Sequence, residues 1–382
     1  FTTTAITPNP SAGGAGMSLE KAIGYFTPTS YPSFFLGSGH GAVIYDPQKG
    51  AKITIAREGY HYEKAKPFLY PGDTYPGIIA SVDNTLVWYQ NPANWNGGDA
   101  SKPWPKYIIN SKSGCHDLEI ADLDSNGKQD VACSGTALYK ERSLLVFQNT
   151  HNSWTPSQIN PAPAAEGIAL VSIGGVNGRA RTNIVGCNDE KLYWYENPGG
   201  VAAGTTAWTP HYIGPCNDGV SIASVDVGDR DLVVVASNEE RPTAWAPGLV
   251  YFDPGDNPYG AWTQRSIDSS YRDVHQITSG TLAGITYITV GEQEQASKTC
   301  NRQAYDSHPN VRGCRVAIFP WTGTSFGAPT IVSHLGTQNQ QVLQIGDVAW
   351  MVGANHNAFR AVDPAFHLWR FQRRKVFDPV RR

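Results

Sequence analysis

The chain has 382 residues, and its 30 Lys and Arg against 33 Asp and Glu give a formal charge of −3. Forty per cent of the residues are hydrophobic and 16% are charged, which is enough apolar material for a large core and excludes wholesale disorder. No apolar run is long enough for a membrane-spanning helix. The near-neutral charge argues against nucleic acid as a partner. The 39 Gly and 26 Pro predict many turns, and the 42 aromatic residues favour an all-β chain.

The chain begins at Phe1 without an initiator Met, so we expect a mature, secreted protein whose signal peptide has been removed. Its six Cys are an even number, as a disulfide set requires, although six cysteines allow 15 connectivities. Positions between predicted strands favour three bridges. These are Cys300–Cys314, which closes a polar insert, then Cys115–Cys133 and Cys187–Cys216.

Three short strings recur in the same order along the chain. The first string is a strand, a tight turn and another strand. The second string contains a recurring aromatic residue, here called the anchor, and the third string begins with Trp. The strand–turn–strand string occupies 40–59, 116–135, 167–188, 219–238, 274–293 and 342–357. The anchor string occupies 86–92, 144–150, 192–198, 249–255, 316–322 and 368–372, and the Trp string 104–109, 154–159, 208–213 and 262–267.

Each repeat therefore predicts four short strands, and the spacing of about 50 residues is that of a β-propeller blade. A ring of four-stranded sheets covers faces that a lone sheet leaves exposed. We predict one all-β domain over 1–382, a propeller with seven blades preferred and six as the alternative. The segments 1–39 and 60–80 supply the seventh blade, and N-terminal residues help to close the ring. The only helix-like stretch is 17–26.

The start of each first strand and the end of each second strand are expected at one end of a propeller. This rule places a group of histidines, arginines and other polar or aromatic residues at one mouth. The group is His40, Arg57, Tyr60, His61, His116, Arg142, Arg241, Trp245, His275, Glu292 and His356. Five of the ten His converge there, which favours a functional site.

The segment 122–130, with the sequence DLDSNGKQD, spaces oxygen ligands at alternate positions before a Gly, as calcium loops do. The candidate ligands are Asp122, Asp124, Asn126, the Lys128 carbonyl and Asp130. The alternative is a tight turn held by its own carboxylates. Since this turn lies at the end away from the histidines, any calcium there is expected to be structural.

The strings ADLDSNGKQD and VGDRDLVVVAS resemble the VCBS/FG-GAP-type repeats of secreted propellers. The wider pattern, through HDLEIADLD and the WY-x-NP strings, resembles the fungal secreted seven-bladed L-rhamnose-α-1,4-D-glucuronate lyases. It is also similar to the propeller domain of aldos-2-ulose dehydratase. The resemblance implies a secreted enzyme that removes rhamnose from glucuronate in arabinogalactan-type gums. Its repeats specify the propeller more strongly than the reaction.

Such a lyase acts by β-elimination, which needs a cation on the uronate carboxylate, a base at C5 and an acid for the leaving oxygen. His40 and His61, with Tyr60, are the candidate base and acid, and Arg57 and Arg241 are candidates to hold the carboxylate. Trp245 is a candidate to stack on a sugar ring. His116, Arg142, His275, Glu292 and His356 complete the expected substrate-binding set.

Three alternatives remain open: a glycoside hydrolase, which needs two carboxyl groups at a set separation, a sugar dehydratase, and a non-catalytic carbohydrate-binding propeller. We expect a monomer that takes a uronate-containing polysaccharide or oligosaccharide. No cofactor is expected for the chemistry.

Overall fold

The computed structural model consists of β-strands joined by turns, and the only helix among its described residues is the 3-10 turn η1 (Pro92–Asn94). It describes residues 2–6, 20–29, 31–38, 41–57, 62–112, 114–135, 143–150, 153–160, 164–173, 181–200, 208–216, 220–237, 248–271, 274–282, 284–292, 314–334, 339–345, 348–354 and 366–372. A search of these residues for a helix long and apolar enough to cross a membrane finds none.

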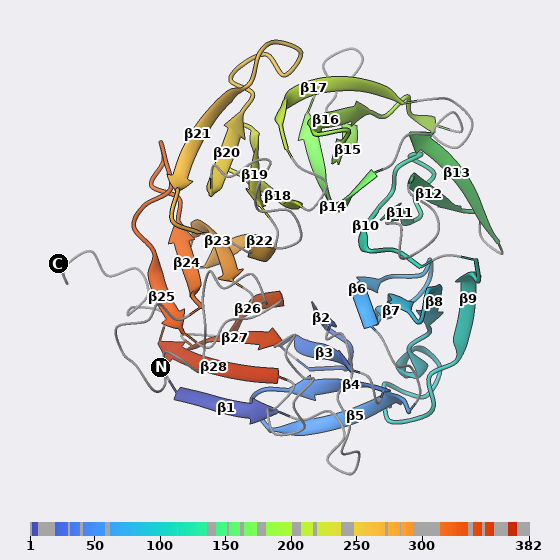
Figure 1. The fold of residues 1–382 in the computed structure, drawn as a ribbon. Helices are drawn as coiled ribbons and strands as arrows, with labels where there is room; N and C mark the ends of the chain where they lie inside the picture. Colours follow the sequence, from blue (N-terminus) through green and yellow to red (C-terminus); the bar gives the residue numbers. More distant parts are fainter. Residues whose placement is uncertain are drawn as a thin grey trace. The chain divides into compact units, whose positions relative to one another are not determined.

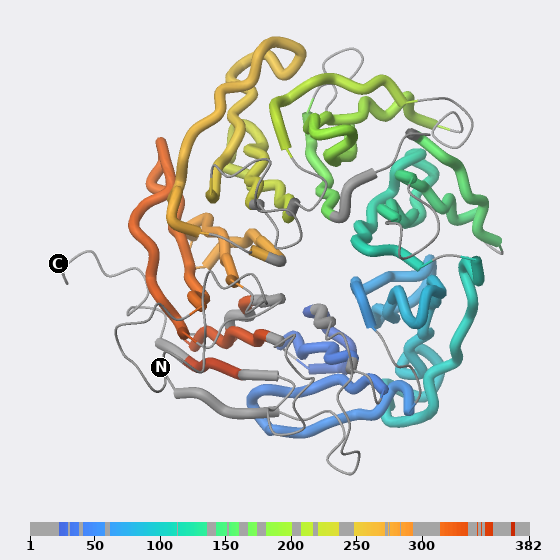
Figure 2. The backbone as a smooth tube through the Cα atoms, viewed as in Figure 1, coloured from blue at the N-terminus to red at the C-terminus, as the bar shows by residue number. Residues whose placement is uncertain are grey.

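The described strands form seven four-stranded antiparallel sheets, and the fold is an all-β propeller, as the repeats predict (Figure 1). Six of the sheets are made of four consecutive strands, so the chain completes one sheet before it starts the next (Figure 2). The strands divide between two compact units, which are described separately below.

The first unit comprises residues 1–62, 91–104 and 273–382 and contains three sheets. Two are β2 (Glu20–Gly24), β3 (Ser33–Ser38), β4 (Gly41–Asp46), β5 (Ala51–Ala56), and β22 (Val274–Leu282), β23 (Ile285–Glu292), β24 (Val316–Pro320), β25 (Thr330–Ser333). The third is β26 (Asn339–Ile345), β27 (Val348–Ala354), β28 (Phe366–Gln372) and, as its fourth strand, the N-terminal β1 (Thr2–Ile6).

The second unit comprises 63–90 and 105–272 and contains four sheets. The first two are β6 (Tyr62–Phe68), β7 (Gly77–Val82), β8 (Thr85–Tyr89), β9 (Lys106–Asn110), and β10 (Asp117–Ala121), β11 (Asp130–Ser134), β12 (Leu144–Asn149), β13 (Trp154–Asn160). The others are β14 (Ala164–Ile173), β15 (Arg181–Asn188), β16 (Lys191–Glu196), β17 (Thr209–Pro215), and β18 (Val220–Asp226), β19 (Asp231–Ser237), β20 (Leu249–Asp253), β21 (Thr263–Asp268).

Five of the repeated aromatic anchors lie on the third strands of their sheets and are buried. Tyr89, Phe147, Tyr195, Phe252 and Phe319 are at most 3% exposed. They contribute to apolar clusters such as the one that joins Ile79 and Trp88 of one sheet to Leu118 and Val131 of the next. Burial of this apolar surface is the main favourable term in folding, so the anchor spacing sets the spacing of the sheets.

Two sequence-based expectations about the N-terminal third are wrong. The helix-like stretch 17–26 contains the strand β2, because Ala22 and Ile23 pair with Phe35 and Phe34 of β3 and this pairing outweighs the local helix propensity. The hairpin within 40–59 is also the third and fourth strands of its sheet, not the first and second. The first strand of the β6–β9 sheet instead begins at Tyr62.

Buried asparagines connect neighbouring sheets. Asn197, which follows β16, donates through Nδ2 to the Leu123 carbonyl (2.6 Å), two residues beyond β10, and accepts from the Gly199 N–H at Oδ1 (2.8 Å). Asn91, which follows β8, makes the equivalent bond to the Phe26 carbonyl (2.8 Å), two residues beyond β2. The Asn of the recurrent Asn-Pro after the anchor aromatic thus hydrogen-bonds to a backbone carbonyl beyond its own sheet, and we call this contact the latch.

Two predicted disulfides are present. Cys115–Cys133 joins the residue before β10 to β11 with a Cα–Cα distance of 5.3 Å, and Cys187–Cys216 joins β15 to the end of β17 with a Cα–Cα distance of 6.2 Å. Cys314 is also disulfide-bonded, whereas Cys300, its expected partner, lies outside the described residues. All five cysteines among the described residues are therefore disulfide-bonded, which is consistent with a secreted protein.

Replacement of Asn197 by Leu is expected to lower the free energy of unfolding by about 2–4 kcal/mol, because it leaves the buried Leu123 carbonyl without this donor. Chemical denaturation measures the change. Gln264→Ala, at an exposed position of β21, is the control and is expected to stay within about 0.5 kcal/mol of the wild type. Equal stability of the two variants would contradict the latch.

Candidate functional site

Most of the residues predicted to line one mouth lie outside the described part of the chain. These are His40, Tyr60, His61, Arg142, Arg241, Trp245 and His356. His275 lies on β22, but its side chain is not described. Arg57 is exposed immediately after β5. Because β4 and β5 are third and fourth strands, the rule that placed Arg57 beside the end of a second strand does not apply to it.

Glu292 is held by an arginine. Its carboxylate, 1% exposed, accepts from Arg315 Nε at Oε2 and from Nη2 at Oε1 (2.9 Å each), and from the Arg315 backbone N–H (3.0 Å). This two-point pairing fixes the chain where β23 ends and the segment before β24 begins. Its geometry assigns Glu292 a structural contact, and its predicted part in substrate binding stays a prediction.

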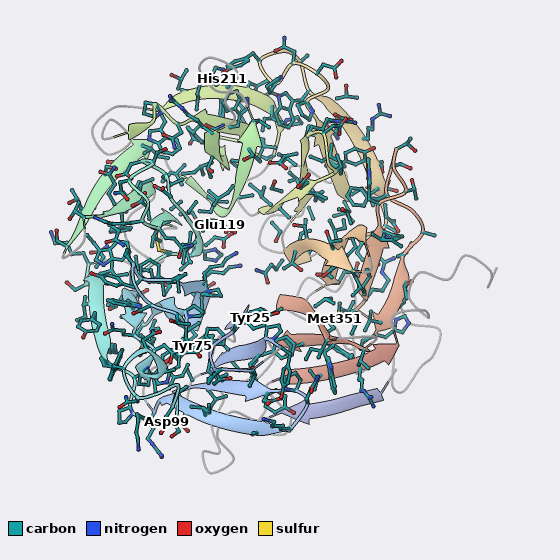
Figure 3. All side chains as sticks on the ribbon, turned by 180° about the vertical axis from the view of Figure 1, so that it is seen from behind. Tyr25, Tyr75, Asp99, Glu119, His211 and Met351 are labelled. Carbon is teal, nitrogen blue, oxygen red and sulfur yellow. A yellow bond between two sulfur atoms is a disulfide. The ribbon has the colours of Figure 1, made fainter. Side chains whose placement is uncertain are left out.

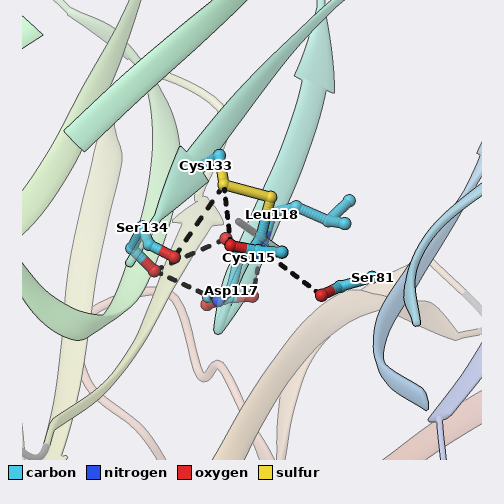
Figure 4. The surroundings of a disulfide bond; sticks show 7 residues. Ser81, Cys115, Asp117, Leu118, Cys133 and Ser134 are labelled. Atoms are coloured by element: carbon cyan, nitrogen blue, oxygen red, sulfur yellow. Dashed lines mark hydrogen bonds between the residues drawn. A yellow bond between two sulfur atoms is a disulfide. The ribbon is translucent and has the colours of Figure 1, made fainter. Parts of the chain in front are cut away.

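His116 is placed by the disulfide that precedes it (Figure 4). The backbone N–H of Cys115 donates to Ser81 Oγ (2.9 Å), and the His116 N–H donates to the Ser134 carbonyl (2.8 Å). The disulfide and these two bonds fix the backbone before β10. His116 Nε2 lies 3.4 Å from Glu63 Oε1 on β6, and both side chains are nearly buried.

Two ion pairs and the Glu63–His116 contact connect the first strands of the two neighbouring sheets β6–β9 and β10–β13. Lys64 Nζ lies 3.5 Å from Asp117 Oδ1, and Lys66 Nζ lies 2.9 Å from Glu119 Oε1. Partners are 53 residues apart in all three pairs, so β6 and β10 match position by position. We call this set (Glu63, Lys64, Lys66, His116, Asp117 and Glu119) the first-strand ion-pair row.

The row differs in exposure along its length. The Lys64 and Asp117 side chains are 6% and 13% exposed, whereas those of Lys66 and Glu119 are 30% and 23% exposed. Asp117 also accepts from the Ile168 N–H of β14 (3.1 Å), so it is fixed between three sheets. The Lys66–Glu119 pair therefore offers solvent access, and Figure 3 labels Glu119 on β10.

Burial raises the pKa of the Glu119 carboxyl above its usual range; the nearby Lys66 opposes that rise and Asp117 adds to it. A carboxyl with a raised pKa is suited to donate or accept a proton near neutral pH. A Lys beside it supplies a positive charge for an anionic ligand. The row therefore combines a cation and a proton-transfer group in one partly exposed place.

The sequence analysis found His116 but missed Glu63, Lys64, Lys66, Asp117 and Glu119. Charged residues in YEKAKPF hide the apolar pattern of a buried strand, so β6 was not recognised. A signal was nevertheless present. Segments 63–66 and 116–119 occupy equivalent repeat positions, carry opposite charges at two of them, and pair Glu63 with His116 at a third.

The turn between β10 and β11 brings three carboxylates together. Asp122, Asp124 and Asp130 each offer an oxygen, all within 4.8 Å of one another. The Asn126 N–H donates to Asp122 Oδ1 and Asp124 Oδ1 (3.0 Å each), and the Lys128 N–H donates to Asn126 Oδ1 (2.8 Å).

Burial, aided by the neighbouring carboxylates of Asp124 and Asp122, raises the pKa of Asp130 to about 6 against the opposing effect of two backbone N–H donors. A bound cation favours the charged form of such a carboxylate. Oxygen donors in this number suit calcium. Calcium binding by this turn stays a prediction.

Comparisons with known proteins identify the fold alone. No family model matches the chain, and no curated protein sequence matches it. A solved structure described as an Agrocybe aegerita lectin that recognises non-reducing terminal N-acetylglucosamine aligns over 94% of this chain and 86% of that chain, with 12% identity and a TM-score of 0.51. A chain of a mitotic checkpoint complex aligns over 97% and 90%, with 7% identity and a TM-score of 0.58.

Calcium is expected to raise the melting temperature relative to EDTA-treated protein, because a ligand that binds only the folded state stabilises it, by about 2.7 kcal/mol at a hundredfold excess over Kd. Asp124→Asn is expected to remove most of this rise. Asp229→Asn, in the equivalent exposed turn of the β18–β19 hairpin, is expected to keep it. Identical melting of wild-type protein in calcium and in EDTA would instead support a turn held by its own hydrogen bonds.

Proposed function

We propose that this protein binds a uronate-containing carbohydrate at the first-strand ion-pair row and cleaves it by β-elimination, as a secreted carbohydrate lyase. The observation that carries the proposal is the partly exposed Lys66–Glu119 pair at one place in an otherwise buried row. Buried ion pairs contribute little net stability compared with apolar packing. Charged side chains kept on two adjacent first strands therefore favour a role in ligand binding.

Lys66 is the group that takes the substrate carboxylate. A uronate carboxylate at this position accepts a charge-assisted hydrogen bond from Lys66 Nζ. The ammonium group neutralises the carboxylate next to C5, and this makes the C5 proton more acidic. A second carboxylate beside Lys66 also favours protonation of Glu119, since like charges disfavour the ionised form.

Glu119 is the proposed acid. It donates its proton to the oxygen that leaves C4 as the C4–O bond breaks, while a base removes the C5 proton and the C4=C5 double bond forms. The sequence-based candidates for the base, His40, His61 and Tyr60, lie outside the described residues. The reaction needs no oxidant, reductant or water as a reactant.

The resemblance to rhamnosyl-glucuronate lyases supports a gum-type substrate with rhamnose on glucuronate. The fold likeness to a lectin supports binding without cleavage as the second candidate. The two functions differ in a direct observable, because only elimination produces an unsaturated uronate that absorbs ultraviolet light.

Incubation with gum arabic is expected to produce this ultraviolet absorbance. Lys66→Ala is expected to weaken gum binding about tenfold or more, as lost charge pairing predicts, whereas Lys66→Arg retains the charge and much of the binding. Glu119→Gln is expected to lower turnover about 10²-fold or more with binding retained, as for other general acids.

Lys191→Ala, an exposed lysine on β16, is the control and is expected to leave both quantities unchanged. Melting temperatures measured beside turnover identify any variant that merely unfolds. Gum binding without ultraviolet absorbance would contradict the lyase and leave a binding protein. Wild-type binding in folded Lys66→Ala would contradict the site itself.

A further inference from the structure

A second cluster of aromatic and polar side chains lies on the third and fourth strands of the β14–β17 sheet. His211 of β17 stacks on Trp194 of β16, with ring centroids 4.2 Å apart and an interplanar angle of 18°. Tyr259, from the loop before β21, meets the His211 ring edge-on at 5.2 Å. Figure 3 labels His211 on this outer strand, away from Glu119.

Glu196 connects these rings. Its Oε1 accepts from Tyr259 OH (2.8 Å), and its Oε2 lies 2.9 Å from His211 Nε2. The side chains of Glu196 and His211 remain 22% and 24% exposed. Tyr259 is 49% exposed, whereas the Trp194 ring beneath His211 is buried. We call Trp194, Glu196, His211 and Tyr259 the rim cluster.

The loop that carries Tyr259 is preorganised. The Tyr259 N–H donates to Asn257 Oδ1 (3.1 Å), and the Gly260 N–H donates to the Asn257 carbonyl (3.0 Å). Trp262 Nε1 donates to the Pro258 carbonyl (2.9 Å), so this buried indole fixes the loop backbone. An aromatic ring held in place before binding loses little entropy when a ligand arrives.

The same positions of the β6–β9 sheet show what simple packing requires. There Tyr107 stacks on Trp88 at 5.1 Å, and Tyr70 covers the other side of Trp88. Gln90 follows the anchor aromatic where the β14–β17 sheet has Glu196. Three rings suffice to pack that sheet, so the carboxylate and the imidazole of the rim cluster are additions to the repeated arrangement.

The added groups define the chemistry of a ligand. The half-exposed Tyr259 ring offers a flat apolar face to the C–H face of a pyranose ring, and each carboxylate oxygen of Glu196 retains a lone pair for a sugar hydroxyl. The negative charge of Glu196 disfavours a uronate carboxylate by like-charge repulsion. The rim cluster therefore suits a neutral sugar.

We propose that the rim cluster is a second carbohydrate-binding site, specific for neutral pyranose residues and separate from the first-strand ion-pair row. The proposal goes beyond the function of that row. A polysaccharide with acidic ends and a neutral backbone would engage both sites on one chain, and two linked contacts raise the overall affinity without cleavage.

Native gels that contain a neutral arabinogalactan test the site, since they measure retardation of the intact protein. The wild type is expected to be retarded, and Tyr259→Ser and Glu196→Gln are each expected to weaken this binding about fivefold to tenfold. Tyr107→Ser, which removes an exposed tyrosine stacked on Trp88 of the β6–β9 sheet, is expected to bind as the wild type does. Lys66→Ala is also expected to retain this binding, which separates the site from the proposed function.

Several outcomes would overturn the proposal. These are no retardation of the wild type, wild-type retardation of both folded rim variants, or an equal loss in Tyr107→Ser. Concentration-dependent dimerisation that Tyr259→Ser abolishes, with no neutral-polymer binding, would also overturn it in favour of an interface between copies. Melting temperatures of all variants are measured alongside, and Tyr259→Phe, which keeps the ring and loses its bond to Glu196, replaces any variant that fails to fold.

Discussion

A four-stranded antiparallel sheet has two faces, and in this protein both must be covered by neighbouring sheets. The buried anchor aromatics and the Asn197 latch follow from this constraint, because each sheet is stable only when its loops and faces meet the next one. The first strands lie where polar side chains are largely removed from solvent. Any charge kept there needs a partner on the adjacent strand.

The first-strand ion-pair row is the consequence. The 53-residue offset between β6 and β10 places each charge opposite its partner, and the disulfide Cys115–Cys133 fixes where this register begins. Solvent access increases towards Lys66 and Glu119. The repeated sheets thus position the first strands, and the residues that differ between equivalent strands provide the charged groups of the site. The rim cluster follows the same rule on the outer strands, where Glu196 replaces the Gln of an earlier repeat.

Repeats and anchor aromatics predicted the propeller because they report apolar packing, which a sequence records directly. The first strands were harder to recognise. β6 carries three charged residues, Glu63, Lys64 and Lys66, within four positions, so its pattern matched no strand template and the hairpin at 40–59 took its place. Pairing with β3 likewise outweighed the helix propensity of 17–26. The residues that hid the strand are the same residues that form the candidate site.

The conclusion that Lys66 receives a uronate is tested most directly by a crystal structure of the protein with a glucuronate-containing oligosaccharide. The account predicts the uronate carboxylate within hydrogen-bond distance of Lys66 Nζ, with Glu119 facing the oxygen on C4. A uronate bound elsewhere, with the Lys66–Glu119 pair undisturbed, would contradict it.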